Sequence, residues 1–458
     1  VVMKEFDLII IGGGRSSSLA KMAGNLGKKV ALIEKDALGG TCPNRGCVPS
    51  KLLIGYAHAV RNVKEAHRHF IDATVHHIDV EKIFEKTNAY IAKIDELYQK
   101  KFNENVTIFR GTGSFVSNKV VQVNDELLTA QHIVIATGSR PVKPPHEKAW
   151  SSDDIFPLKH IPKSIALVGS GFIAVELANF FDAMGIPTKL LVRSDTLLGN
   201  EDETISTIFK EEFTKNVDVA FNTTIKEILY ENNQFELTLE NKKGETSHHT
   251  CEALLYATGR ESNSDTLNLN NTSIELNDKG YIKHNEFFET HVKDVFVVGD
   301  ATGKNMLQHA AAYEINHLGK YLYEGEKTAL KFKYMPHAVF CEPEVASVGI
   351  TEQEARKSNQ EYVATTTPWI ASAKAQSLRI KYPLTKFIVH PYTYEILGCH
   401  LIGPESSTMI HQVLAVMHLS NDIRHLKEML YIHPALSEAL LPASVECLKA
   451  IKKYKEAR

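Results

Sequence analysis

Short apolar runs alternate along the chain with turn signals and helical periodicity. The first run, residues 7–11, leads into a glycine turn and a helix-compatible stretch, and a second run follows at residues 29–34. The same order of strand, turn and helix recurs from Ser164, with its second strand at residues 188–192. Strand-sized runs that alternate with helical periodicity predict parallel sheets covered by helices. The expected fold class is therefore α/β.

Between the two repeats, apolar side chains recur at a helical spacing. This pattern predicts one amphipathic helix packed on the sheet, and such faces are usually core rather than cofactor contacts. Its expected apolar side chains are Ile83, Phe84, Tyr90, Ile91, Ile94, Leu97 and Tyr98.

The pattern changes at about Tyr334. From there, alternating apolar segments predict strands, and helical periodicity then continues to the C-terminus. We expect these strands at residues 339–341, 346–350, 386–389 and 396–401, and the charged tail at 449–458 as a solvated helix end. This part of the chain predicts a separate α+β domain.

The composition agrees with a globular protein of two to four domains. The chain has 458 residues, 43% of them hydrophobic, and 52 basic against 55 acidic side chains give a formal net charge of −3. A balance so close to neutral gives no basis for binding nucleic acid or an anionic membrane. The apolar runs are far shorter than the ~20 residues of a transmembrane helix. The first strand also begins too early for a signal peptide, so we expect a cytoplasmic protein.

The glycine turns carry the first chemical signal. In the first repeat, Gly12 and Gly14 follow the strand, and Glu34 ends the next strand. Glycines let the backbone approach a pyrophosphate at the helix N-terminus, and the acid can accept hydrogen bonds from a ribose. Ser17 stands where a third glycine is usual, and we expect it to loosen the packing of the helix on the strand.

The second repeat has Gly169, Gly171 and Ala174 in the corresponding places. Two such turns predict two dinucleotide sites in one chain. A tightly held flavin dinucleotide and an exchangeable nicotinamide dinucleotide are the simplest pair. Each region ends in Ala-Thr-Gly, at residues 136–138 and 257–259, and we expect these segments to mark the crossings between domains.

Two of the six cysteines, Cys42 and Cys47, form a close pair. In a reducing compartment, such a pair is more typical of catalysis or metal binding than of a structural disulfide. A zinc site is disfavoured because the chain has no second cysteine pair and no histidine at ligand spacing, so we predict no metal. Two thiols about one turn apart at the start of a helix can close a disulfide, and the helix dipole favours the attacking thiolate.

The sequence resembles the class I pyridine nucleotide-disulfide oxidoreductases over essentially its whole length. The resemblance rests on residues 39–51 around the cysteine pair, the two glycine turns, the two Ala-Thr-Gly segments, Val298-Gly299-Asp300 and His433-Pro434. That family includes glutathione reductase, dihydrolipoamide dehydrogenase, mercuric reductase and mycothione reductase.

The resemblance implies two Rossmann-like dinucleotide-binding domains and a C-terminal α+β dimerisation domain. The FAD-binding domain would be discontinuous because the NAD(P)-binding domain interrupts it. The implied ranges are 3–143 with 264–332 for FAD, 144–263 for NAD(P) and 333–458 for dimerisation.

The same resemblance implies roles for the cysteine pair and its neighbours. Cys42 would be the interchange thiol that attacks the substrate disulfide. Cys47 would contact the flavin and form a thiolate-to-flavin charge-transfer complex. Lys51 would pair with Glu176 beside the flavin, which keeps positive charge where the reduced flavin becomes anionic.

Late in the chain, His433 and Glu438 match the family's His-Pro-x-x-x-Glu dyad. A histidine can take a proton from one thiol and return it to a leaving thiolate, while the carboxylate fixes its tautomer. In the family this histidine reaches across from the other subunit. The resemblance therefore implies a homodimer with shared active sites.

The cofactor contacts implied by the resemblance fall into two groups. For FAD they are Gly12, Gly14, Glu34, Gly40, Thr41, Lys51, Gly113, Ala136, Thr137, Gly138, Asp300 and Gln308. For NADPH they are Gly169, Gly171, Ala174, Glu176, Arg193 and Gly259.

The choice of NADPH rests on the end of the second repeat's second strand. Val192 stands where NADH-using members carry a glutamate, and Arg193, which can pair with a 2′-phosphate, follows it. Ala174 and Ala178 also resemble NADPH-using members. Gly199 replaces the second phosphate-binding arginine of glutathione reductase, which predicts a weaker site.

The predicted function is therefore NADPH-dependent reduction of a low-molecular-weight disulfide, such as mycothione or glutathione disulfide, by an FAD enzyme. Several segments look most similar to mycothione reductase, but the lysine- and asparagine-rich chain is untypical of a mycothiol-producing source. Mercuric reductase is disfavoured because its C-terminal cysteine pair is missing. The first alternative is an NAD-dependent dihydrolipoyl dehydrogenase. The second is a non-catalytic flavin- or metal-binding partner of a larger complex.

Overall fold

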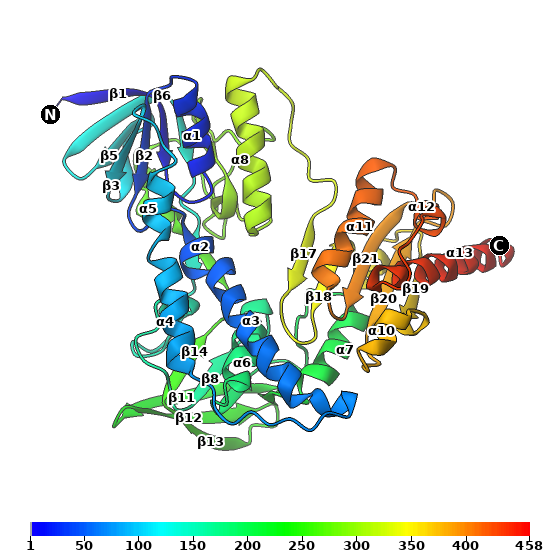
Figure 1. Ribbon diagram of the computed structural model, residues 1–458. Coiled ribbons are helices and arrows are strands. Elements are labelled where there is room, and N and C mark those ends of the chain that lie inside the picture. The colour runs from blue at the N-terminus through cyan, green and yellow to red at the C-terminus, as the bar shows by residue number, and fades with distance from the viewer. Residues whose placement is uncertain (1) are drawn as a thin grey trace.

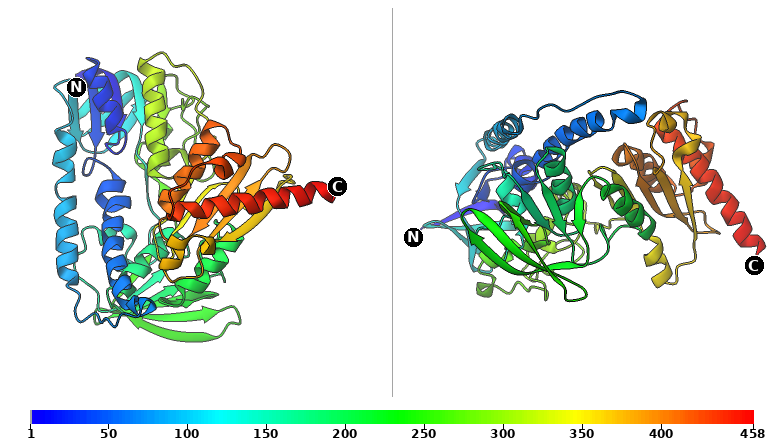
Figure 2. Two further views of the ribbon diagram at one scale, coloured as in Figure 1. Left: turned by 45° about the vertical axis from the view of Figure 1, so that its right-hand side comes forward. Right: turned by 90° about the horizontal axis from the view of Figure 1, so that it is seen from below.

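The structure is a computed structural model that describes residues 2–458. Figure 1 shows three sheet-based units. The N-terminal strands, in blue and cyan, form the first unit, and the green strands form the second unit below it. The third unit, in orange and red, lies beside both and ends in a long helix that projects from the molecule in each view of Figure 2.

The first unit is built on a seven-stranded sheet. Its elements are β1 (Met3–Ile11), β2 (Val30–Glu34), β3 (Val106–Arg110), β4 (Gly113–Ser117), β5 (Val120–Val123), β6 (Glu126–Ile135), β16 (Val295–Val297), α1 (Ser17–Asn25) and α8 (Gln308–Tyr323). The strands β3, β2, β1, β6 and β16 pair in parallel, and the β4–β5 hairpin extends β6 in antiparallel fashion. Leu8 and Ile10 of β1 pack with side chains of α1 and α8, while Ile9 and Ile11 pack on the opposite face. The central strand is therefore buried on both faces, as expected for a parallel sheet.

The second unit has a parallel sheet of order β10-β9-β8-β14. Its elements are β8 (Ile165–Val168), α6 (Phe172–Ala183), β9 (Thr188–Leu191), α7 (Glu203–Phe213), β10 (Asp218–Ala220), β11 (Thr223–Glu231), β12 (Gln234–Asn241), β13 (Thr246–Cys251) and β14 (Ala253–Tyr256). The antiparallel sheet β11-β12-β13 covers one face, where Phe235 and Leu237 pack on Ala166. A two-stranded ribbon of β7 (Ser139–Pro141) and β15 (Arg260–Ser262) follows the two Ala-Thr-Gly segments.

The segment between the two repeats differs from the prediction, because it forms two helices instead of one. The local elements are α2 (Thr41–Arg45), α3 (Cys47–Lys64), α4 (Val80–Ile91) and α5 (Ile94–Gln99). The helix α4 packs on α3 and α6 rather than on the sheet, and Phe84 meets Phe180 edge-on at 5.7 Å between ring centroids. Tyr90 and Leu97 are exposed, whereas Tyr98 reaches the core of the first sheet. The long α3 leads away from the first sheet, and its apolar side chains pack on α4 in place of that sheet.

The third unit has an antiparallel sheet of order β17-β18-β21-β20-β19. Its elements are β17 (Pro336–Val339), β18 (Val345–Gly349), α9 (Glu352–Lys357), β19 (Val363–Pro368), α10 (Ala373–Ser377), β20 (Leu384–Val389), β21 (Ile396–Ile402), α11 (Ser406–Leu419), α12 (Arg424–Glu428) and α13 (Leu440–Glu456). The edge strand β19 was missed by the prediction, since three of its six residues are threonines. The tail is also less solvated than expected, because Ile451 of α13 is buried in the core of this unit.

Short 3-10 helices complete the chain. They are η1 (Ala66–His69), η2 (Ser152–Ile155), η3 (Asn263–Thr266), η4 (Leu269–Asn271), η5 (Gly299–Thr302), η6 (Trp369–Ala371) and η7 (Leu436–Ala439).

None of the helices described for residues 2–458 combines the length and apolar character needed to cross a membrane. The expected α/β class, with two dinucleotide-type sheets and a C-terminal α+β unit, is confirmed.

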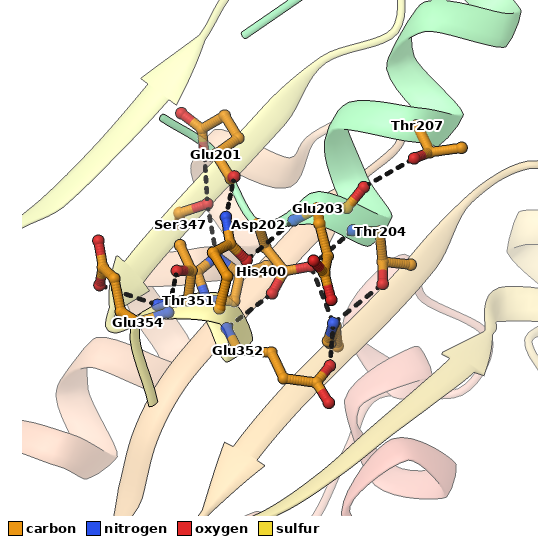
Figure 3. Close-up of polar contacts among 12 residues, drawn as sticks. Glu201, Asp202, Glu203, Thr204, Thr207, Ser347, Thr351, Glu352, Glu354 and His400 are labelled. Atoms are coloured by element: carbon orange, nitrogen blue, oxygen red, sulfur yellow. Dashed lines mark hydrogen bonds and ion pairs between the residues drawn. The ribbon is translucent and has the colours of Figure 1, made fainter. Parts of the chain in front are cut away.

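A buried polar cluster joins the second unit to the third (Figure 3). Ser347, His400 and Lys386 are register neighbours across β18, β21 and β20, so they share one face of the sheet. Lys386 Nζ lies 2.9 Å from Asp202 Oδ1 and 2.6 Å from Glu352 Oε2. Asp202 also caps α7 by accepting a hydrogen bond from the Thr204 N–H. Burial opposes its ionisation, yet hydrogen bonds from the Glu352 N–H and from Lys386 hold the pKa of Asp202 below its usual value.

This geometry predicts a large loss of stability when Lys386 is replaced with Met. The buried Asp202 carboxylate would lose its counter-ion, which should lower the free energy of unfolding by ~3–5 kcal/mol. Urea denaturation followed by circular dichroism would measure the loss. Lys449→Met is the matched control, because Lys449 pairs with Glu446 on the surface and exposed pairs contribute little. Equal losses in the two variants would contradict the role assigned to Lys386.

Candidate active site

A cavity of about 330 Å³ opens at the carboxyl ends of β1, β2 and β6. Eleven of the twelve residues predicted to contact FAD line it, and Lys51 is the exception. Cys42 also lines the cavity, next to Gly40 and Thr41. The cavity thus brings together residues from both sequence parts of the first unit, including Asp300 and Gln308 from the second part.

Two glycines that line the cavity are required by close backbone approach. Gly12 has φ +111°, and a Cβ there would lie 2.1 Å from the carbonyl oxygen of Ala136. Gly40 has φ +74°, and a Cβ there would lie 2.7 Å from the Cα of Gly14. Both conformations favour glycine, and both leave the backbone bare where a phosphate group would approach.

Ser17 fits its place at the helix start, contrary to the expected loosening. It is buried, and its hydroxyl donates to the carbonyl oxygen of Gly13 at 2.9 Å. Glu34 holds the same turn from the other side. Its Oε2 accepts from the Gly13 N–H at 2.7 Å and its Oε1 from the Asp36 N–H at 2.8 Å, while burial raises its pKa.

The cavity has polar groups suited to a dinucleotide. Thr137 Oγ1 is buried and has no hydrogen-bond partner among residues 2–458. Ser139 donates to Asp300 Oδ2 at 2.6 Å and accepts from Arg260 Nε at 2.8 Å, which orients the carboxylate at the cavity. The orphaned hydroxyl, the bare glycine turn and the acid at the end of β2 fit a flavin dinucleotide. Sequence reasoning missed Ser139 and Arg260, although Ser139 directly follows an Ala-Thr-Gly segment.

The two thiols of the pair differ in their affinity for a proton. Cys42 lies on α2 and Cys47 begins α3, and both are free. The Cys42 thiol donates a hydrogen bond to the Cys47 sulfur, and this contact lowers the pKa of Cys47 to about 7, with the charge of Lys51 as a further cause. The same contact and burial raise the pKa of Cys42. Cys47 is therefore the thiolate of the pair near neutral pH, and Cys42 keeps the proton.

Lys51 and Glu176 form an ion pair between the first and second units. Lys51 Nζ of α3 lies 3.0 Å from Glu176 Oε2 of α6. The other carboxylate oxygen accepts from the Phe340 N–H at 2.8 Å, and the Phe340 ring lies 4.8 Å from Lys51 Nζ. Glu176 is 4% exposed, and burial raises its pKa against the effect of Lys51. Sequence reasoning missed Phe340, because one aromatic after a short strand carries no signal of this contact.

His433 and Glu438 lie in the third unit, outside the cavity that holds Cys42. The imidazole Nδ1 is 2.8 Å from Glu438 Oε1, and Glu438 Oε2 accepts from the Ala435 N–H at 3.0 Å. These contacts lower the pKa of Glu438. The His433 side chain is 76% exposed, so its Nε2 edge is open to a neighbour.

The second glycine turn has the same construction as the first. Gly169 has φ +143°, and a Cβ there would lie 2.3 Å from the carbonyl oxygen of Ala257. Gly171 caps α6, and Ala174 is fully buried against the turn. Gly259 has φ +124° in the segment that follows β14.

At the edge of the second sheet, Val192 is buried and Arg193 is exposed. Among residues 2–458, the Arg193 side chain has no ion pair within 4.0 Å. The free guanidinium is thus available to an anionic ligand at this edge. Within the same residues, no group of three or more His, Cys, Asp or Glu side chains could hold a metal ion.

Comparisons with known proteins agree over almost the whole chain. Residues 6–314 match the family described as pyridine nucleotide-disulphide oxidoreductase, and residues 335–444 match its dimerisation domain. Dihydrolipoyl dehydrogenase of Chlamydia pneumoniae is 31% identical over 445 residues, covering 95% of each chain. Dihydrolipoyl dehydrogenase of Bacillus subtilis (strain 168) is 30% identical over 455 residues, covering 96% of each chain.

Solved structures show the same similarity. The Cu(II) complex of the HOCl-induced flavoprotein disulfide reductase RclA from Escherichia coli superposes with a TM-score of 0.86 at 25% identity. The match covers 97% of this chain and 100% of that chain.

The thiol pair generates a prediction about pH. In the reduced protein, Cys47 should become a thiolate as the pH rises through about 7. Cys42→Ala removes the donor and should raise the pKa of Cys47, whereas Cys42→Ser keeps an O–H donor and should hold it nearer its original value. The ultraviolet absorbance of the thiolate would follow the titration.

The other four cysteines do not obscure this titration, because burial raises the pKa of each thiol well above neutral pH. Lys51→Met removes the second cause and should also raise the pKa of Cys47. Identical titrations of the original protein, Cys42→Ala and Cys42→Ser would mean that the two thiols do not share a proton.

Proposed function

The chain belongs to the pyridine nucleotide-disulphide oxidoreductase family, and from this premise we propose that it is an FAD- and NADPH-dependent reductase of a low-molecular-weight disulfide. The observation that carries the proposal is the position of Cys42 in the wall of the dinucleotide cavity. Its partner Cys47 is a thiolate near neutral pH, beside the Lys51–Glu176 pair. A dithiol in this position suits electron transfer between a flavin and an external disulfide.

FAD, when bound, would carry two electrons between the nicotinamide and the dithiol. The glycine turn at Gly12 would hold its pyrophosphate, Glu34 its ribose and Asp300 its ribityl chain. Lys51, whose charge acts on Cys47, would keep positive charge near the flavin, which favours an anionic reduced ring.

The dithiol would reduce the substrate in two exchanges. The Cys42 thiolate attacks one sulfur of the disulfide, so that a mixed disulfide forms and the first substrate thiolate leaves. Cys47 then attacks Cys42 and releases the second substrate thiolate, which closes the Cys42–Cys47 disulfide. The two electrons of the dithiol end on the two substrate sulfurs.

The first exchange needs a base, because Cys42 holds the proton of the pair. None of the residues that line the cavity within 2–458 is a histidine. The exposed His433, fixed by Glu438, would supply the base if a second copy docks its third unit over the cavity. We therefore propose a homodimer in which His433 of the partner subunit takes the Cys42 proton and returns it to the leaving thiolate.

Arg193 supports NADPH as the reductant. Within residues 2–458, the guanidinium at the end of the second sheet has no ion-pair partner, which matches a 2′-phosphate, whereas a carboxylate there would match the ribose diol of NADH. Ser194 and Thr196 follow it with exposed hydroxyl groups. Gly199 offers no side chain, so the phosphate would depend on Arg193 alone for an arginine contact.

A second candidate is an NAD-dependent dihydrolipoyl dehydrogenase. The similarity to dihydrolipoyl dehydrogenases at 29–31% identity favours it. The same dithiol would then be reduced by dihydrolipoamide and oxidised toward NAD+. The two candidates differ in the nucleotide, in the substrate and in the direction of electron flow.

Steady-state assays would separate these candidates. We expect NADPH oxidation with at least one small disulfide from a panel that includes glutathione disulfide and mycothione, and weaker activity with NADH. Dihydrolipoamide with NAD+ would be assayed in parallel. Activity confined to lipoamide substrates and NAD(H) would replace the proposal with the second candidate.

Cys42→Ser is the matched control for the assay. It should abolish disulfide turnover. The FAD-loaded protein, with a reduced Cys47 thiol and an oxidised flavin, should keep the long-wavelength absorbance of the thiolate-to-flavin charge-transfer complex, because Cys47 remains. Loss of that absorbance in Cys42→Ser, but not in Cys47→Ser, would mean that the two thiols have the opposite roles.

The nucleotide preference gives a further prediction. Arg193→Ala should raise the KM for NADPH by about tenfold to hundredfold, since it removes a charge-assisted hydrogen bond. The KM for NADH should stay unchanged. Lys189→Ala is the control, because this neighbouring cation on β9 is already paired with Asp218 at 2.9 Å. Equal changes for both nucleotides would show that Arg193 does not recognise the phosphate.

A further inference from the structure

Residues 336–342, here called the junction segment, contact all three units of the molecule. His309 Nε2 of α8 lies 2.6 Å from the carbonyl oxygen of Pro336 at the start of the segment. Near its end, Cys341 Sγ donates to the carbonyl oxygen of Val175 on α6 at 3.7 Å. The segment also contains β17, the edge strand of the third unit. Its backbone position is therefore set jointly by the three units.

Phe340 is the residue of the junction segment that meets the Lys51–Glu176 pair. Its N–H satisfies one oxygen of the buried Glu176, and its ring covers Lys51. A displaced Phe340 would leave a buried carboxylate oxygen without a donor and Lys51 without its aromatic neighbour. Lys51 also contributes to the lowered pKa of Cys47, so a change at Phe340 reaches the thiol pair.

His337 anchors the junction segment three residues before Phe340. Its Nε2 lies 2.6 Å from Glu201 Oε1, and the Ser347 hydroxyl donates to Glu201 Oε2 at 3.0 Å. His400 continues this chain of contacts at 3.0 Å from Ser347 (Figure 3). Burial opposes the charges, yet their contact holds the pKa of Glu201 below and the pKa of His337 above the usual values. The contact thus favours the charged form of each group.

A contact that fixes one residue of a short extended segment also restricts the position of residues a few places further along the segment. Three residues of strand span about 10 Å, and each backbone unit has only two soft dihedral angles. Glu201 is itself fixed, because Gln353 donates to its carbonyl oxygen at 2.8 Å and the adjacent Asp202 is held by Lys386. His337 therefore contacts a glutamate whose own position is fixed.

We propose that His337, held by Glu201, is a positioning residue for the reduction site, which keeps Phe340 in place over Lys51 and Glu176. The inference rests on the proposed function only where turnover is measured. The ion pair and the thiol pair that it positions are features of the chain itself.

His337→Phe would test the proposal, since it keeps a ring of similar size and removes the nitrogen that meets Glu201. The pKa of the Cys47 thiol in the reduced protein should rise, because Lys51 is held less well. In stopped-flow experiments, the rate of flavin reduction by NADPH should fall by about tenfold to hundredfold. The KM for the disulfide should not change. His337→Gln, whose amide can donate to Glu201, should restore both readouts.

Ser347→Ala is the matched control. It removes the other hydrogen bond to Glu201 but leaves the junction segment attached, so it should reduce stability without moving the pKa of Cys47 or the rate of flavin reduction. Equal effects of Ser347→Ala and His337→Phe would overturn the proposal. An unchanged pKa of Cys47 in a folded His337→Phe protein would also overturn it.

Phe340→Leu keeps the test decisive if His337→Phe does not fold. It leaves the anchor intact, removes the ring over Lys51 and should reproduce the rise in the pKa of Cys47. An unchanged titration would overturn the inference. Failure of the original protein to reduce its flavin with either nicotinamide nucleotide would instead count against the proposed function, and the Cys47 titration would still decide the positioning role.

Discussion

The arrangement of the three units depends on the buried carboxylate of Glu176. A carboxylate placed on a helix as apolar as α6 is costly unless every oxygen has a partner. Lys51 comes from the first unit and the Phe340 N–H from the third, so the charge is satisfied only when all three units are docked. Nearby contacts reinforce the same docking, since Arg61 of α3 donates to Asp182 of α6 at 2.8 Å. The ion pair of the candidate site thus lies where the three units contact one another.

The parts of this site that could be predicted from the sequence are local. Gly12 and Gly169 each precede a helix by a few residues, and in the structure each backbone passes within van der Waals range of an Ala-Thr-Gly carbonyl. The spacing of Cys42 and Cys47 likewise places two thiols at one helix start. Local spacing is enough in these cases because one turn of backbone determines the geometry.

The parts that could not be predicted depend on contacts between distant segments. Phe340 reaches Glu176 across 164 positions of sequence, and no periodicity marks it. The break between α4 and α5 has a similar origin, because α4 follows the surface of α3 and α6 rather than the sheet. The buried position of Lys386 was also hidden, since a lysine at the start of a predicted strand is usually exposed to solvent. Tertiary docking made that position interior.

The asymmetry of the thiol pair connects the fold to its assembly. One shared proton stays on Cys42, because the hydrogen bond to Cys47 and the charge of Lys51 stabilise the thiolate at Cys47. The thiol in the wall of the cavity therefore cannot attack a disulfide until a base removes its proton. His433 is positioned by Glu438 and is exposed to solvent in the single chain. An exposed pair adds little to stability, whereas a base that acts on a second subunit would need this exposure. In the proposed mechanism, the contacts that make Cys47 the thiolate leave Cys42 in need of a base, which a second subunit would supply.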